Sequence, residues 1–275
     1  MSTSGTSPRP RPRVTSPAEP PVSRRVIIIR VGVITVTVLA LLFIWHRTEQ
    51  FLIRDAHFAM NGPEGVDDAS IIQLQGATHA SRRAVEGVFS DDLGKSVYLL
   101  PLSDRRSTLR AIDWVKDATV ARVWPNRVMV RLTERKPVAF VTLGSSRYGL
   151  IDDDGVILPP AADRFHLPVL RGVRASDAIP DRRERVQRMQ RVMRALGQNA
   201  SKIAEVDVSD RGAIKVTQPY EGHMVTLILG DQNFAARYQN FVNHYAEIRD
   251  KLPGASALDL RLEDRITVVD EKGGA

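Results

Sequence analysis

The 275-residue chain contains no cysteine. Disulfide bonds, thiolate metal sites and a cysteine nucleophile are therefore excluded. The absence does not assign a compartment, because an extracytoplasmic domain of this size can fold without disulfide bonds. Hydrophobic residues make up 43% of the chain, which is enough for the core of one large domain or two modest ones.

Motifs of common catalytic, nucleotide and metal sites are also missing. No histidine has the His-Glu-x-x-His spacing of a zinc site, and neither a Gly-x-Ser-x-Gly elbow nor a glycine-rich loop followed by Lys-Ser or Lys-Thr occurs. The run "DDDG" at 152–155 does not alternate its carboxylates as an EF-hand does, so we predict a hairpin turn. A catalytic carboxylate pair stays open, since folding can bring any two acids together. We expect no enzyme, cofactor or metal site, and histidines with surface or packing roles.

Positive charge is concentrated at the N-terminus. The formal net charge is +7, but residues 1–30 hold six arginines against the single acid Glu19 and carry +5 of it. The remaining 245 residues carry only +2, so we expect no nucleic-acid partner. A second group of arginines, at 182–194, is predicted to be the solvated face of an amphipathic helix, with contact to anionic lipid or a partner as the alternative.

Residues 1–25 are rich in serine, threonine and proline, with "PRPRPR" at 8–13. Such a segment has no apolar set to bury, so we predict a disordered cytoplasmic tail. A docking peptide for a proline-recognising partner is the alternative.

The longest apolar run, "VIIIRVGVITVTVLALLFIW", covers residues 26–45. As a helix, such a run spans about 30 Å, the thickness of a hydrocarbon core. A cleaved signal peptide fits less well because no Ala-x-Ala site follows, and a core helix fits less well because the run is apolar on all faces. We predict a retained transmembrane helix. More arginines precede it than follow it, which places the N-terminus in the cytoplasm and residues 46–275 on the far side.

After a predicted linker and strand lead-in at 46–66, the pattern at 67–136 indicates a compact α+β domain. Pro137 cannot donate to a continuing strand ladder, so we place the domain boundary there. The predicted elements are a strand at Ser70–Gln75, a helix capped by Ser81 and reaching Phe89, a helix capped by Ser103 and covering Leu109 and Ile112, with its extension to Val115 left open, and strands at Ala118–Val123 and Val128–Thr133.

Residues 137–270 are predicted to form a second, strand-rich domain with flanking helices, followed by a short tail at 271–275. The final strand pair, Leu258–Leu262 and Ile266–Val269, lies near the chain end, where a strand often forms a sheet edge. An unpaired edge can accept a strand from a partner, and internal pairing or protection is the equally open alternative. The remaining predicted elements are strands at Ala139–Leu143, Tyr148–Ile151, Val156–Leu158, Glu205–Val208, Ala213–Thr217 and Met224–Leu229, and helices at Asp181–Gln198 and Gln232–Leu252.

Three ordered motifs resemble the bacterial cell-division family FtsQ, called DivIB in Gram-positive bacteria. "VARVWPNRVMVRLTERKP" at 120–137 is similar to the end of that family's POTRA domain. "LIDDDGVIL" at 150–158 resembles the hairpin that opens its β domain, and "LDLRLEDRITV" at 258–268 resembles its terminal pattern. The resemblance covers residues 26–269 and implies a membrane helix, a POTRA domain of order β-α-α-β-β and an FtsQ-type β domain.

The resemblance further implies a non-catalytic scaffold in the bacterial inner membrane at the division septum. Its partners would be FtsB- and FtsL-like proteins and other divisome components, with no small-molecule substrate. In the family, FtsB adds a strand beside the last strand of the β domain and contacts the preceding helix. Carried over by motif, the partner-binding residues would be Arg237, Leu260, Leu262, Asp264, Arg265 and Ile266.

Two other classes of function compete with this interpretation. A POTRA-containing assembly or secretion component would carry an outer-membrane barrel after its POTRA repeats, but only 138 residues follow Pro137 and helices interrupt them. A membrane-anchored cell-wall enzyme would need a catalytic constellation that no motif here supplies.

Overall fold

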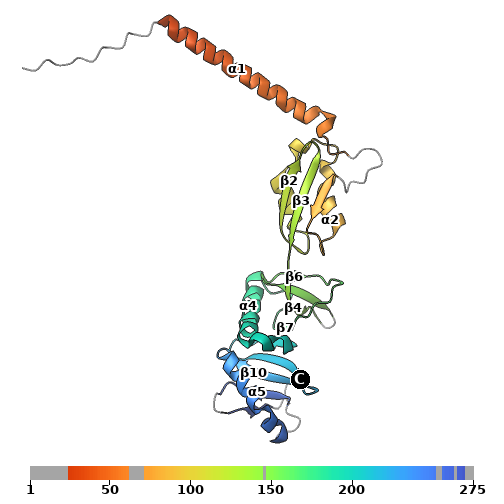
Figure 1. Ribbon diagram of the computed structural model, residues 1–275, viewed down its shortest axis with the longest axis vertical. Helices are drawn as coiled ribbons and strands as arrows, with labels where there is room; N and C mark the ends of the chain where they lie inside the picture. Colours follow the sequence, from red (N-terminus) through yellow and green to blue (C-terminus); the bar gives the residue numbers. More distant parts are fainter. Residues whose placement is uncertain (1–23, 62–70, 145–146, 252–255, 263–264, 270–275) are drawn as a thin grey trace, which may run out of the picture.

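The computed structural model describes residues 24–61, 71–144, 147–251, 256–262 and 265–269. The first element is helix α1 (Arg24–Arg54), which extends away from the folded domains (Figure 1). Its large apolar side chains are exposed from Ile27 to Trp45. The hydroxyl groups of Thr35 and Thr37 donate hydrogen bonds to the carbonyl oxygens of Val31 and Val33, both at 2.9 Å. These polar groups are therefore satisfied within the helix. Among the described residues, α1 is the one helix long and apolar enough to cross a membrane.

Helix α1 continues nine residues beyond the predicted span, into the segment predicted as a linker. The extension "HRTEQFLIR" contains no proline or glycine that would end a helix, and the Thr48 hydroxyl donates to the carbonyl of Ile44 at 2.8 Å. Asp55 then caps a short 3-10 helix (Ala56–Phe58) by accepting from the N–H of His57. Within its described residues, the segment is therefore ordered secondary structure rather than a linker.

The first domain contains a three-stranded sheet with the order β1-β3-β2. Strand β1 (Ile72–Gln75) runs parallel to β3 (Arg127–Glu134), and β3 pairs antiparallel with β2 (Val115–Val123). Helices α2 (Arg82–Gly87) and α3 (Leu102–Leu109) precede β2, which confirms the predicted β-α-α-β-β order.

Side-chain patterning in this domain follows the prediction on β3 and departs from it at α3. Val128, Val130 and Leu132 are buried on one face of β3, as the alternation predicts. The prediction that Ser103 caps a helix covering Ile112 is wrong: α3 begins at Leu102 with Pro101 in the cap position. It ends at Leu109 with Arg110 as its C-cap, and the chain turns at Trp114, where φ is +70°, before it enters β2.

The second domain is built on a nine-stranded sheet with the order β12-β11-β10-β9-β8-β7-β4-β5-β6. Figure 1 shows helices α4 and α5 beside this sheet. One strand, β7, is absent from the sequence prediction, because its three residues lie between Pro168 and Gly172 and give no measurable alternation. The elements are β4 (Pro137–Thr142), β5 (Tyr148–Asp152), β6 (Ile157–Leu158), β7 (Val169–Arg171), α4 (Ile179–Leu196), β8 (Glu205–Asp207), β9 (Ile214–Tyr220), β10 (His223–Gly230), α5 (Phe234–Lys251), β11 (Ala257–Asp259) and β12 (Thr267–Val268).

Helix α4 carries the arginines that the sequence assigns to a solvated face. Its apolar side is buried against the sheet through Val186, Met189, Val192 and Leu196. The prediction is wrong for Arg188, which is 6% exposed and donates to the carbonyl oxygens of two residues beyond β8, at 3.0 and 2.7 Å. Burial lowers the pKa of Arg188, because desolvation disfavours its charged form.

Candidate partner-binding edge and domain junction

Strand β12 lies at one end of the nine-stranded sheet. It pairs antiparallel with β11 through Leu258 opposite Val268 and Asp259 opposite Thr267. The N–H of Val269 donates to the carbonyl of Ala257 at 3.0 Å. Because backbone groups alternate in direction along a strand, Thr267 and Val269 face β11, and the N–H and C=O groups of Val268 face away from the sheet. In the described parts of the chain, no strand pairs with that outer edge.

Side chains near β12 also alternate. Ile266 and Val268 are half-buried and pack against the core of the second domain, whereas Arg265, Thr267 and Val269 are exposed. An added strand would therefore meet an apolar side and a polar side, which is the arrangement that gives sequence preference in strand addition.

The predicted contact residues separate into surface and core positions. Leu262 is 52% exposed, and Arg265 and Ile266 adjoin the open edge. Leu260, in contrast, is 1% exposed in the core, and its N–H donates to the carbonyl of Ile228. Its side chain holds β11 in place rather than facing a partner. Asp264 lies outside the described residues.

Arg237 on α5 is also buried, at 9% exposure. Its Nη1 donates to the carbonyl of Leu229 at 2.6 Å, at the end of β10. Gly230 follows with φ +74°, and a Cβ there would come within 2.6 Å of Nη1. Glycine at this position thus lets α5 approach the sheet closely, and Arg237 supports the strands beneath the edge.

An ion pair that sequence reasoning missed lies between β11 and the loop toward β12. Arg261 Nη2 is 2.6 Å from Asp259 Oδ2, and the N–H of Arg261 donates to Asp259 Oδ1 at 2.9 Å. The side-chain hydrogen bond from Arg261 holds the pKa of Asp259 below its usual range. The pair therefore stabilises the turn that follows β11. The Asp-Leu-Arg spacing at 259–261 is the sequence signal that could have indicated it.

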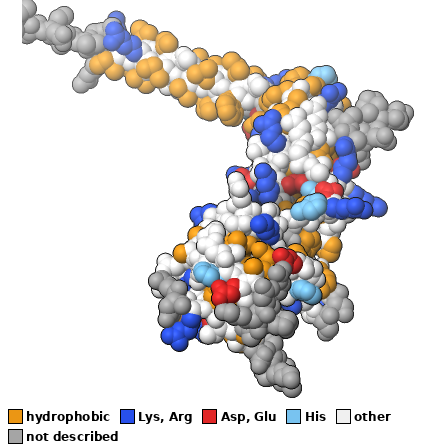
Figure 2. Space-filling model, turned by 60° about the horizontal axis from the view of Figure 1, so that its bottom comes forward, with side chains coloured by type: hydrophobic (Ala, Val, Ile, Leu, Met, Phe, Trp, Pro, Cys, Tyr) orange, Lys and Arg blue, Asp and Glu red, His pale blue; other side chains and the backbone are white. Residues whose placement is uncertain are grey.

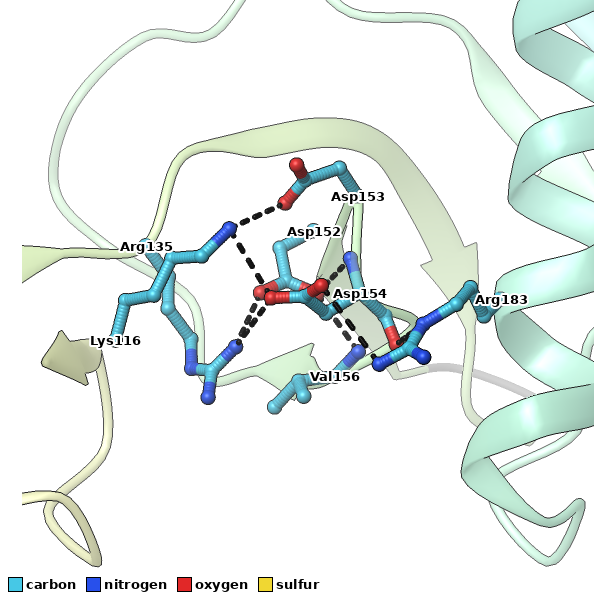
Figure 3. A network of polar contacts seen from close by, with 7 residues as sticks. All are labelled: Lys116, Arg135, Asp152, Asp153, Asp154, Val156 and Arg183. Atoms are coloured by element: carbon cyan, nitrogen blue, oxygen red, sulfur yellow. Dashed lines mark hydrogen bonds and ion pairs between the residues drawn. The ribbon is translucent and has the colours of Figure 1, made fainter. Parts of the chain in front are cut away.

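The acidic run at 152–154 forms the predicted hairpin turn between β5 and β6 (Figure 3). Asp152 is fully buried, accepts from the N–H of Val156 at 2.8 Å and lies 2.6 Å from Arg135 Nη1. Although the three carboxylates are close enough to share an ion, cations of the protein already occupy that space. Lys116 Nζ lies 3.2 and 3.1 Å from the two carboxylates that follow Asp152, and its hydrogen bond lowers the pKa of Asp154.

This turn joins the two domains, because Lys116 and Arg135 belong to or directly follow strands of the first domain, and the aspartates belong to the second. An apolar cluster runs alongside. Leu150 and Leu158 of the second domain pack with the core of the first. The junction is therefore a packed interface with a polar network at its side.

His79 makes a second connection across the junction. Its Nδ1 lies 2.9 Å from Glu134 Oε2 in the first domain, and its Nε2 lies 2.8 Å from Asp163 Oδ2 in the second. The ring stacks on Trp114 at a centroid distance of 4.4 Å, and Phe165 lies beyond. The hydrogen bond to Glu134 raises the pKa of His79, since the charged imidazolium suits both carboxylates.

Comparison with known proteins matches both domains to families. The description "Cell division protein FtsQ/DivIB, C-terminal" matches residues 139–261, and "POTRA domain, FtsQ-type" matches residues 68–135. The first of these ends at Arg261, before β12. Together they cover most of the chain that follows α1.

Relatives named cell division protein FtsQ match more than half of the chain. The protein of Koribacter versatilis is 33% identical over 208 residues, which is 73% of this chain and 60% of the relative. That of Allochromatium vinosum is 26% identical over 61% of this chain and 65% of the relative, and that of Neisseria gonorrhoeae is 25% identical over 72% and 77%. The chain thus spans less than two thirds of the first two relatives. With both domain types matched in order along the chain, it belongs to the FtsQ/DivIB family of cell-division proteins.

Proposed function

We propose that this protein is a non-catalytic, single-pass scaffold of the bacterial division machinery. Helix α1 would anchor it in the inner membrane with the N-terminus in the cytoplasm, and both folded domains would lie on the far side, at the septum. Family membership supports the division role, and the exposed apolar surface of α1 supports the anchor. The arginine excess before α1 supports the orientation.

The scaffold binds an FtsB-like protein, together with its FtsL-like companion, by adding a strand to β12, and so links early and late division proteins. The observation that carries this proposal is the outward-facing backbone of β12 at the end of the sheet. Backbone hydrogen bonds would supply affinity, and the exposed side chain of Leu262 would supply apolar contact at one end. Arg237 and Leu260 act from beneath, by holding β10 and β11 in position.

The mechanism predicts which backbone N–H groups matter. Val268→Pro removes an N–H that faces the partner but takes no part in the ladder with β11, whereas Val268→Ala shortens the same side chain and keeps that N–H. Proline is tolerated on edge strands when its nitrogen faces outward. The full chain in detergent should therefore capture the FtsB-like partner as Val268→Ala and fail to capture it as Val268→Pro. Ile266→Pro, with Ile266→Val as control, repeats the comparison two residues earlier, at the preceding N–H group that faces outward.

Unchanged thermal unfolding of the proline variants would show that the fold is intact. Full capture of the partner by Val268→Pro would contradict strand addition. A fluorescent fusion of the chain should form a septal band in dividing cells, and an even peripheral signal would contradict the division role. Turnover of peptidoglycan by the purified chain would contradict the non-catalytic assignment.

A further inference from the structure

The described part of the first domain exposes two large hydrophobic side chains, Leu99 and Trp124, at 49% and 52%. Trp124 begins the turn between β2 and β3, and its ring packs edge-on against Phe58 at 5.7 Å. Phe58 in turn packs against Phe51 of α1 at 5.6 Å, and Phe51 is 57% exposed. These four residues are termed the juxtamembrane patch. Figure 2 shows hydrophobic side chains continuing from α1 onto the adjoining end of the domain.

Hydrogen bonds hold the juxtamembrane patch in place beside α1. Ser96, three residues before Leu99, donates its hydroxyl to the carbonyl of Leu52 in α1 at 2.7 Å. Met60 is buried, and its N–H donates to the carbonyl of Lys95 at 2.9 Å. The first domain is thus docked on the end of α1 and does not hang from a linker.

The position of the patch along α1 places it at the outer boundary of the membrane interface. Trp45 ends the apolar run, and Phe51 follows six residues later, about 9 Å further along the helix. The headgroup region extends roughly 5–8 Å beyond each side of the hydrocarbon core. The domain also leaves α1 at an angle rather than in line with it (Figure 1). An aromatic turn at this height borders the headgroup region, where tryptophan side chains collect in membrane proteins.

We propose that the juxtamembrane patch contacts the outer headgroup layer of the membrane that α1 spans, with Trp124 as its main anchor. The contact orients the first domain on the bilayer and so sets how far β12 stands from the membrane. This inference rests on the proposed membrane anchoring by α1.

The absence of cysteine allows a direct test with single spin labels. The full chain would be reconstituted in phosphatidylethanolamine–phosphatidylglycerol vesicles with a nitroxide at Arg127→Cys or Arg131→Cys. Both arginines are exposed on the same face of β3, but Arg131 lies about 14 Å further from the turn. We expect the label at 127 to collide with oxygen in preference to a water-soluble nickel complex, and the label at 131 to show the reverse.

Trp124→Ser should shift the label at 127 to the behaviour of the label at 131. Tyr148→Ser, which removes an aromatic side chain of the second domain that is 60% exposed, should leave it unchanged. Leu99→Ser provides a second variant if Trp124→Ser lowers the unfolding temperature.

Different failures separate the two proposals. If alkaline carbonate extracts the chain from the vesicles, both the anchoring and the contact are contradicted. If the chain stays embedded and the labels at 127 and 131 are equally accessible to nickel, only the contact is contradicted. Spin–spin broadening between labels on two chains would assign the patch to a second copy and also contradict the membrane contact.

Discussion

Replacement of Asp152 by asparagine tests whether the domain junction depends on one buried carboxylate. The side-chain oxygen of asparagine can still accept from the N–H groups of Asp154 and Val156. Its NH2 group, however, would face the guanidinium of Arg135, which now lies 2.6 Å from a carboxylate oxygen, so two donors would meet there. Breaking a buried ion pair costs about 3–5 kcal/mol. Arg135 would still form an ion pair with Asp154, at 3.5 Å, so we expect Asp152→Asn to lower the free energy of unfolding by a smaller amount, about 2–3 kcal/mol.

The neighbouring residue supplies a matched control. Asp153 is 53% exposed and pairs with Lys116 at 3.2 Å, so Asp153→Asn should cost about 0–1 kcal/mol, as exposed ion pairs do. Urea unfolding of the detergent-solubilised full chain, followed by circular dichroism, measures both variants. An Asp152→Asn loss no larger than that of Asp153→Asn would refute the assignment of Asp152 as the centre of the junction.

Three further predictions concern other buried or strained groups. His79 has a pKa raised above its ordinary 6.5, so its stabilisation is full below pH 6.5 and declines as the pH rises through its folded-state value; His79→Gln should flatten that decline in pH-dependent unfolding. Gly230→Ala should cost about 1–3 kcal/mol from left-handed strain, plus the clash with Arg237, and exceed the cost of Gly222→Ala, which adds no clash; equal costs in urea unfolding would contradict the close approach. Arg188→Ala should lower unfolding free energy by about 2–3 kcal/mol through two lost charged hydrogen bonds, and equal stability to wild type would contradict their role.

Local rules predicted the elements that depend on neighbouring residues. The alternation of Val128, Val130 and Leu132 predicted the buried face of β3, and the "DDDG" run predicted the β5–β6 turn. The helical spacing of the apolar residues in α4 predicted its buried side. Of the four residues in that pattern, Val186, Met189 and Leu196 are buried, and Met193 is partly buried against the same core.

Features set by distant partners could not be read in the same way. Arg188 looked like one more exposed arginine, because the carbonyl groups that bind it lie in another part of the chain. Leu260 and Arg237 are in the core for the same reason: their burial depends on how β10, β11 and α5 pack. Strand β7 was too short to show a period, and the strand order of the sheet follows from long-range pairing that composition does not encode.

Residue-level amide hydrogen exchange of β12 tests strand addition most directly. In the full chain without partner, the N–H groups of Thr267 and Val269 face β11, whereas that of Val268 faces outward. Addition of the FtsB-like partner should slow exchange at Val268 far more than at Thr267 and Val269, because only the outward group gains a new hydrogen bond. If the partner binds and exchange at Val268 stays unchanged, the partner does not add a strand to β12.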